Sequence, residues 1–261
     1  MSGRDDGGEA LVLTYHSVSD AAGPTSISPD TFAMQMETLA ACGYDSATLD
    51  EFLDWHEGKR PLGRKLLITF DDGFSDFVDH ALPILEDHGF GALMFVPTRK
   101  LGAPEDWEGA NRPARRLMHG CELAALQARG VEFGAHSRTH ANLPRLSADE
   151  REEEIAASGA DLADLLGRPT KSFAAPYGAV DADTVAAIGR HYPIAFGTRF
   201  APALAGVDRH DIPRIDMHYF RARAHWRNFL EGRRGYFRLR QALRWLGNKV
   251  RGNTILQGGY S

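Results

Sequence analysis

The sequence predicts an α/β protein of one domain, in which parallel strands form a (β/α) barrel of about seven strands. An open, doubly wound sheet is the alternative. Short apolar runs that suit strands alternate with helical patterns along the chain, which is typical of a parallel sheet with helical crossovers. The run 66–70 is almost entirely apolar, as expected of a strand covered on both faces. No linker rich in Pro, Gly or Ser divides the 261 residues.

Each element follows from its own residues. We expect strands at 11–16, 66–70, 92–96, 131–135, 171–174 and 194–196. We expect helices at 28–42, 74–88, 122–129, 147–166 and 181–191. Ser28 and Pro29 suit an N-cap and a first helical position, and Ser147 with Glu150 forms a capping box. The segment 99–116 predicts a long surface loop that walls a substrate groove.

Composition excludes several classes of protein. The chain is 43% hydrophobic and 25% charged, with a mean hydropathy of −0.34, and no apolar run is long enough to span a bilayer. Cys42 and Cys121 form no CxxC pair, which excludes a zinc ribbon or a dithiol redox site. We expect both cysteines to be reduced and buried. The polar start of the chain shows no secretory signal, which predicts a cytoplasmic protein.

Basic residues are concentrated near the C-terminus. The stretch 221–251 contains ten basic residues and one acidic residue, a net charge of +9, whereas the whole chain carries −5. Its apolar residues at helical spacing are Phe229, Tyr236, Leu239, Leu243, Leu246 and Val250. This pattern predicts a basic amphipathic C-terminal helix, which either packs on the domain or lies on an anionic membrane at the inner membrane face. No nucleic-acid-binding motif is present, and we expect no nucleic-acid partner.

These observations divide the chain into three parts. We expect a disordered N-terminus at 1–9, a barrel at 10–220 and a basic helical extension at 221–261.

Residues that can perform chemistry follow the predicted strands. Asp71 and Asp72 come after the second strand, His136 and His140 follow the fourth, and His16 ends the first. The carboxyl ends of parallel strands meet at one face of such a fold, so these side chains should gather there. Two histidines and one carboxylate suit a catalytic zinc site with an open position, which leaves Asp71 free to act as a base. A turn, a helix cap or an incidental loop histidine explains each motif separately; the combination is more specific.

At these positions the sequence resembles the polysaccharide deacetylases, carbohydrate esterase family 4. The matching motifs are Thr69-Phe70-Asp71-Asp72-Gly73, His136-Ser137-x-x-His140 and Pro176-Tyr177-Gly178. The resemblance implies a distorted (β/α) barrel and a divalent metal, usually zinc, that serves to remove N-acetyl groups from amino sugars. It implies that Asp71 is the catalytic base and that the backbone N–H of Tyr177 helps to hold the oxyanion. The metal ligands that it implies are Asp72, His136 and His140.

The sequence departs from the pattern of this family at two positions. The third motif usually has an arginine two residues before its proline, where this chain has Ala174. Arg214 could supply the guanidinium from a later strand, or it could be a surface or structural arginine. The usual C-terminal acid histidine is not evident. Tyr15-His16 resembles the N-terminal strand of a permuted branch in which the acid histidine comes first, so we favour His16 as the acid over His218.

Together these features predict a metal-dependent hydrolase that removes N-acetyl groups from an amino-sugar-containing glycan or glycan precursor. The alternatives are a hydrolase of a non-sugar amide or cyclic imide on the same scaffold and a catalytically dead carbohydrate-binding domain. A binding domain does not require the base Asp71, which argues against the second alternative. A non-haem iron oxygenase shares the ligand set, but its chemistry usually occurs on an all-β fold. The basic segment favours a lipid-linked or nucleotide-linked substrate.

Overall fold

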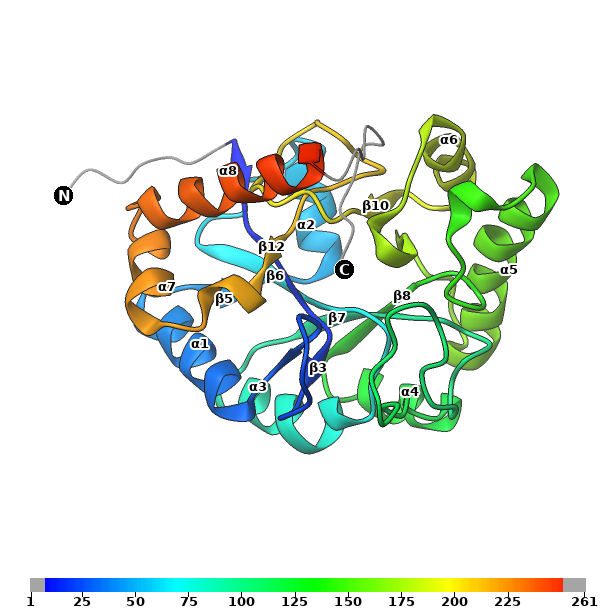
Figure 1. Ribbon diagram of the computed structural model, residues 1–261, viewed down its shortest axis with the longest axis horizontal. Coiled ribbons are helices and arrows are strands. Elements are labelled where there is room, and N and C mark those ends of the chain that lie inside the picture. The colour runs from blue at the N-terminus through cyan, green and yellow to red at the C-terminus, as the bar shows by residue number, and fades with distance from the viewer. Residues whose placement is uncertain (1–7, 251–261) are drawn as a thin grey trace.

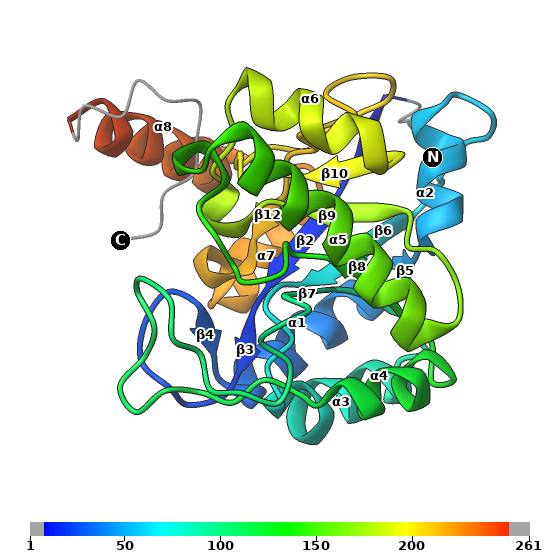
Figure 2. The same cartoon turned by 90° about the vertical axis from the view of Figure 1, so that its right-hand side faces the viewer.

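Parallel strands form one curled sheet at the centre of the molecule (Figures 1 and 2). The structure is a computed structural model that describes residues 8–250. The strands run across the sheet in the order β10 (Ile194–Phe196), β9 (Ser172–Ala174), β8 (Val131–Ala135), β7 (Ala92–Val96), β6 (Lys65–Phe70), β2 (Val12–Tyr15) and β12 (Ile215–Asp216). A short strand, β5 (Asp45–Ser46), also pairs with β6.

The sheet curls into an incomplete barrel. β10 and β12 are the last strands at its two ends. Irregular backbone that leads into β12 bridges the gap, because the N–H of Ala195 donates to the carbonyl of Arg209 at 3.0 Å and the N–H of Ile212 donates to the carbonyl of Ala195 at 2.9 Å. The predicted distorted barrel of about seven strands in a single domain is confirmed.

Helices cover the outside of the curled sheet (Figure 1). The α-helices are α1 (Pro29–Ala41), α2 (Leu49–His56), α3 (Leu82–Asp87), α4 (Gly120–Gln127), α5 (Ala148–Leu166), α6 (Ala182–His191), α7 (Arg223–Leu230) and α8 (Gly235–Val250). A π-helix at Phe77–Ala81 leads into α3, and single 3₁₀ turns lie at Leu143–Arg145, Pro176–Gly178 and Met217–Phe220. Two small sheets pair β1 (Glu9–Ala10) with β11 (Ala203–Leu204) and β3 (Ser17–Val18) with β4 (Ser26–Ile27).

The helix starts follow the capping rules. The Ser28 hydroxyl accepts a hydrogen bond from the N–H of Thr31 at the start of α1, and Ser147 forms a capping box with Glu150 at the start of α5, as predicted. The sequence analysis missed α2, although Thr48 caps it in the same manner.

Alternation along the strands divides the core into two layers. On β6, Ile68 belongs to a cluster that packs under the outer helices, whereas its neighbour Leu67 belongs to a second cluster. β7 repeats the pattern, with Met94 in the first cluster and Phe95 in the second. Successive side chains of a strand point to opposite faces, so a strand that is apolar throughout fills both layers. This two-sided burial makes the sheet a rigid base for the residues at its carboxyl edge.

The C-terminal part differs from the expected single amphipathic helix. α7 and α8 are separate helices, and the apolar residues 229–250 therefore do not share one helical face. Phe229 is buried, but Leu239, Leu243 and Leu246 are about half exposed. One expectation was that the apolar residues of the C-terminal helix pack on the domain. It is wrong for these three leucines, because α8 turns another face inward. The side chain of Val250 lies outside the described residues.

Three smaller expectations can also be compared with the structure. Cys42 and Cys121 are both free, but Cys42 is only partly buried and Cys121 is exposed in the first turn of α4, so their predicted burial is wrong. Of the segment 1–9, residues 1–7 lie outside the described residues, and Glu9 belongs to β1. Within residues 8–250, no helix has the length and apolar character needed to cross a bilayer.

Candidate active site

Four parallel strands bring the candidate residues to one edge of the sheet. Asp71 and Asp72 directly follow β6, His136 directly follows β8, and His16 directly follows β2. Tyr177 lies in the 3₁₀ turn that comes after β9. The four strands are parallel: β2 pairs with β6, β8 pairs with β9, and β7 lies between the two pairs. Residues far apart in the sequence therefore converge at the carboxyl ends of these strands, as the strand pattern predicted.

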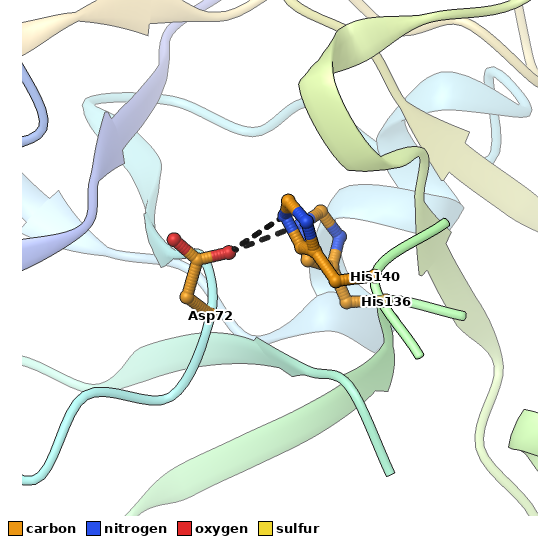
Figure 3. Close-up of side chains that lie close together, drawn as sticks. All are labelled: Asp72, His136 and His140. Atoms are coloured by element: carbon orange, nitrogen blue, oxygen red, sulfur yellow. Dashed lines mark ion pairs between the residues drawn. The ribbon is translucent and has the colours of Figure 1, made fainter. Parts of the chain in front are cut away.

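Asp72, His136 and His140 form a compact group of potential metal ligands (Figure 3). Their ligand atoms all lie within 4.8 Å of one another, and all three residues are buried. Oδ1 of Asp72 is 3.4 Å from Nε2 of His136 and 3.2 Å from Nε2 of His140. Both imidazoles therefore point the same nitrogen at one carboxylate oxygen, which is the arrangement that a single cation between them requires.

The surroundings of this group fit a divalent metal. Oδ1 of Asp72 is buried without a hydrogen-bond partner, a costly state that a coordinated cation would relieve. Nδ1 of His136 donates to the carbonyl of Ala174 at 2.8 Å, which fixes the tautomer that leaves Nε2 free to coordinate. Burial would raise the pKa of Asp72, but the interaction of its carboxylate with the two imidazoles holds it well below its usual value. The carboxylate is therefore ionised and ready to bind a metal.

The backbone around the site adopts conformations that side chains rarely tolerate. Asp72, Ser137, His140 and Tyr177 all have φ between 59° and 72°, in the left-handed region. Gly73 shares this conformation, and a Cβ added there would lie 2.7 Å from Cγ1 of Val96. Left-handed residues cluster where a turn must aim side chains at a site, because the buried sheet beneath them compensates for the strain. The short turns after β6 and β8 thereby direct their side chains toward one point.

Asp71 is separate from the potential ligands and is bound by Arg214. The guanidinium of Arg214 donates to both carboxylate oxygens at 2.7 Å, and both residues are buried. Arg214 also donates to the hydroxyl of Thr69 and to the carbonyl of Gly197. Burial opposes the ionisation of Asp71, but the Arg214 charge outweighs it and lowers the pKa of that carboxyl. Arg214 is thus a buried partner of Asp71 rather than a surface arginine, while Ala174, at the usual arginine position, has no charged side chain.

The two candidate acid histidines differ in position. Nε2 of His16 is 4.0 Å from Oδ2 of Asp71, and His16 lines the same pocket as the potential metal ligands. His218 does not line that pocket; it lies in the turn after β12, beside a small depression that it shares with His16. The geometry therefore favours His16 over His218 for contact with a substrate in the main pocket.

The pocket has a volume of about 170 Å³ and is walled by segments from across the chain. Pro24 and Thr25 line one part of it, and Tyr177 and Thr198 line another. The Tyr177 ring lies edge-on to His140, with ring centroids 4.6 Å apart. Burial raises the pKa of the Tyr177 hydroxyl to about 12, so the hydroxyl remains protonated at neutral pH.

The expected loop 99–116 forms one wall of the pocket. Trp107 stacks on His140 with ring centroids 4.1 Å apart, and Asn111 donates to the carbonyl of Ala22 at 3.0 Å. Glu105 holds this loop together, because it is fully buried and accepts two hydrogen bonds of 2.8 Å from Arg115. Sequence analysis predicted the wall but did not identify these contacts, which depend on the folded loop.

Comparison with known proteins decides the family. The family model for polysaccharide deacetylases matches residues 58–192, just over half of the chain. The chain belongs to the polysaccharide deacetylase family. The matched region contains Asp71, Asp72, His136, His140 and Tyr177, whereas His16 and Arg214 lie outside it.

Individual members of the deacetylase family agree with this assignment. The chain is 24% identical over 177 residues to YxkH of Bacillus subtilis, a protein named for the same family, and the match covers 67% of this chain and 59% of YxkH. It is 29% identical over 80 residues to the poly-β-1,6-N-acetyl-D-glucosamine N-deacetylase of Escherichia coli, a match that covers 29% of this chain and 12% of that protein. The chain thus spans less than two thirds of these relatives.

A solved structure supports the fold independently of the deacetylase sequence motifs. IcaB from Ammonifex degensii superimposes with a TM-score of 0.73 at 24% identity, over 86% of this chain and 96% of IcaB. At this level of identity the likeness shows the shared fold alone.

Proposed function

We propose that this protein is a metal-dependent hydrolase that removes N-acetyl groups from an amino-sugar-containing glycan or glycan precursor. One observation supports it most strongly: a buried carboxylate, Asp71, is held ionised by Arg214 directly beside three convergent metal ligands, without belonging to them. A site that only binds a metal or a sugar does not need this fourth group. The family supports an N-acetylated sugar as substrate, since its Escherichia coli relative is named for such a polymer.

Asp72, His136 and His140 would hold the divalent cation, most simply Zn²⁺, which suits two imidazoles and one carboxylate. When bound, such a cation would supply Lewis-acid chemistry: it would polarise the acetyl carbonyl and bring the pKa of water toward about 7. Asp71 then takes the proton of the attacking water, because its paired guanidinium fixes the orientation of both carboxylate oxygens.

The remaining residues serve the other atoms of the amide. The amine leaves only after protonation, and His16, 4.0 Å from Asp71 in the same pocket, supplies that proton. The backbone N–H of Tyr177 donates to the oxyanion, a contact of a kind worth about 3 kcal/mol in related reactions. Arg214 does not contact the reacting atoms and is a positioning residue, which replaces the arginine absent at position 174. Membership of the permuted branch stays a prediction that rests on His16.

The test separates metal binding from catalysis. Asp71→Asn should keep the affinity for Zn²⁺, measured by isothermal titration calorimetry, and should lose at least about a hundredfold in kcat for acetate release from an N-acetylated amino-sugar oligomer. Asp72→Asn is the matched variant, since it changes the adjacent carboxylate and should lose metal affinity as well. Acetate release at the wild-type rate by Asp71→Asn would exclude it as the base. A wild-type protein that binds Zn²⁺ but releases acetate from no such oligomer would contradict the proposed activity.

A further inference from the structure

α8 presents an apolar face to solvent. Leu239, Leu243 and Leu246 are 56%, 49% and 50% exposed, and their spacing places them on one side of the helix. Trp245, 62% exposed, flanks them. Four large apolar side chains on neighbouring turns form a continuous surface, which is unusual for a helix that packs on its own domain.

Polar contacts hold α8 in this orientation. On its inward face, Nε2 of Gln241 donates to the carbonyl of Phe200 at 2.8 Å, and the guanidinium of Arg244 donates to the carbonyl of Thr198 at 3.3 Å. The guanidinium of Arg240 lies over the ring of Tyr219, 4.2 Å from its centroid. Phe237, in the first turn of α8, is buried against Phe200, so the inward face combines one apolar anchor with these polar contacts, and the leucines face outward. Rotating the helix to bury the leucines would break these contacts.

Charge indicates what covers the exposed leucines. The stretch 221–251 carries a net +9 in sequence, although Arg223, Arg234 and Arg244 pair with carboxylates outside it. Arg238 is exposed beside Leu239 and forms no ion pair with a carboxylate of the described residues. Two copies joined through α8 would bring two such basic stretches together, which is unfavourable. A surface of anionic lipid attracts the basic residues and accepts the apolar side chains below its headgroups. We propose that α8 is an interfacial helix whose outward face inserts into the headgroup region of an anionic lipid bilayer.

The position of α8 gives this contact a consequence for the pocket. α8 and the wall loop 99–116 project on the same side of the sheet (Figure 2). Thr198, whose carbonyl binds Arg244 of α8, also lines the pocket. α8 is therefore anchored to a segment that also lines the pocket. The lipid contact itself does not depend on the proposed deacetylase activity.

Vesicle co-sedimentation of the full chain tests the proposal. The wild type should bind vesicles of phosphatidylcholine with 30% phosphatidylglycerol and should bind vesicles of phosphatidylcholine alone at least about tenfold more weakly. The combined variant Leu239→Gln, Leu243→Gln, Leu246→Gln should lose at least about tenfold in partition coefficient, because glutamine keeps the helix but removes the apolar face. Arg238→Gln should bind about fivefold more weakly, which corresponds to about 1 kcal/mol for one basic residue near an anionic leaflet.

A matched control distinguishes this surface from apolar exposure in general. Leu165, Leu204 and Val207 are 40–45% exposed and lie outside α8, so their combined replacement by glutamine should leave vesicle binding unchanged. Equal binding of the wild type and the α8 variant to the anionic vesicles would overturn the proposal. Light scattering after gel filtration provides a second check: a wild-type dimer that the α8 variant converts to a monomer would show that a second copy covers the leucines, and would also overturn it.

Discussion

The buried pair of Arg214 and Asp71 allows a quantitative test of the site. Arg214→Met keeps much of the side-chain volume but removes the guanidinium that neutralises the buried Asp71 carboxylate through two 2.7 Å hydrogen bonds. Removing one partner of a buried ion pair leaves an uncompensated charge and costs about 3–5 kcal/mol. The free energy of unfolding of the metal-free protein should fall by this amount at pH 7.

A double-mutant cycle isolates the charge from the shape. Adding Asp71→Asn to Arg214→Met removes the stranded carboxylate, so the double variant should recover about 1 kcal/mol or more relative to Arg214→Met alone. Urea unfolding in the presence of a chelator, followed by circular dichroism, measures all four proteins under the same conditions. Additivity of the two single changes within about 0.5 kcal/mol, or a cost below about 1 kcal/mol for Arg214→Met, would refute the assignment of Arg214 as the partner of Asp71.

The pH dependence of the same variant has a defined sign. In the wild type the pKa of Asp71 is lowered, so its contribution to stability is present above the ordinary value of 3.8 and is lost as the pH falls through the lowered value. Without Arg214, burial raises this pKa, and the folded variant takes up a proton at a higher pH than the unfolded chain does. The stability deficit of Arg214→Met should therefore shrink as the pH is lowered from 7 toward 5. A deficit that is constant over this range would show that the carboxylate is not the cause.

Three further predictions concern the metal, the acid and the pocket wall. Zn²⁺ at a hundred times its dissociation constant should stabilise the wild type by about 2.7 kcal/mol over a chelated sample, and Asp72→Asn should show no such gain in a thermal-shift assay. His16→Asn should lower kcat with an unchanged Zn²⁺ affinity, and a parallel loss of affinity would contradict a role as the acid. Glu105→Gln should speed proteolytic cleavage within 104–116 because Arg115 loses its buried partner, whereas Asp106→Asn, which breaks only an exposed ion pair, should leave the rate unchanged.

Local patterns in the chain predicted six strands of the central sheet, most helices and the metal-ligand candidates, but not the two-residue strands β5 and β12. The motif of Asp71 and Asp72 directly follows a strand that is recognisable from its own apolar residues, and the same is true of His136. Parallel strands must place such residues at one edge, so their convergence follows from alternation and connectivity alone. The short helix α2 was missed because eight residues give a weak periodic signal, even with a capping box at its start.

Long-range contacts decided the rest. The sequence alone could not decide whether Arg214 is the partner of Asp71 or a surface or structural arginine. The reason is that 143 residues separate the two, and no local pattern encodes their pairing. The stacking of Trp107 on His140 depends in the same way on a loop that becomes ordered through Glu105 and Arg115.

The amino-acid sequence by itself determined most of the helices and the metal-ligand candidates, because spacing and residue type act over a few positions. The tertiary structure alone decided which side of α8 faces the body. A helical pattern defines two faces without saying which is inward, and here the carbonyls of Thr198 and Phe200 bind the polar face. Those backbone acceptors become available only when the sheet has curled, and they leave Leu239 and its neighbours facing outward.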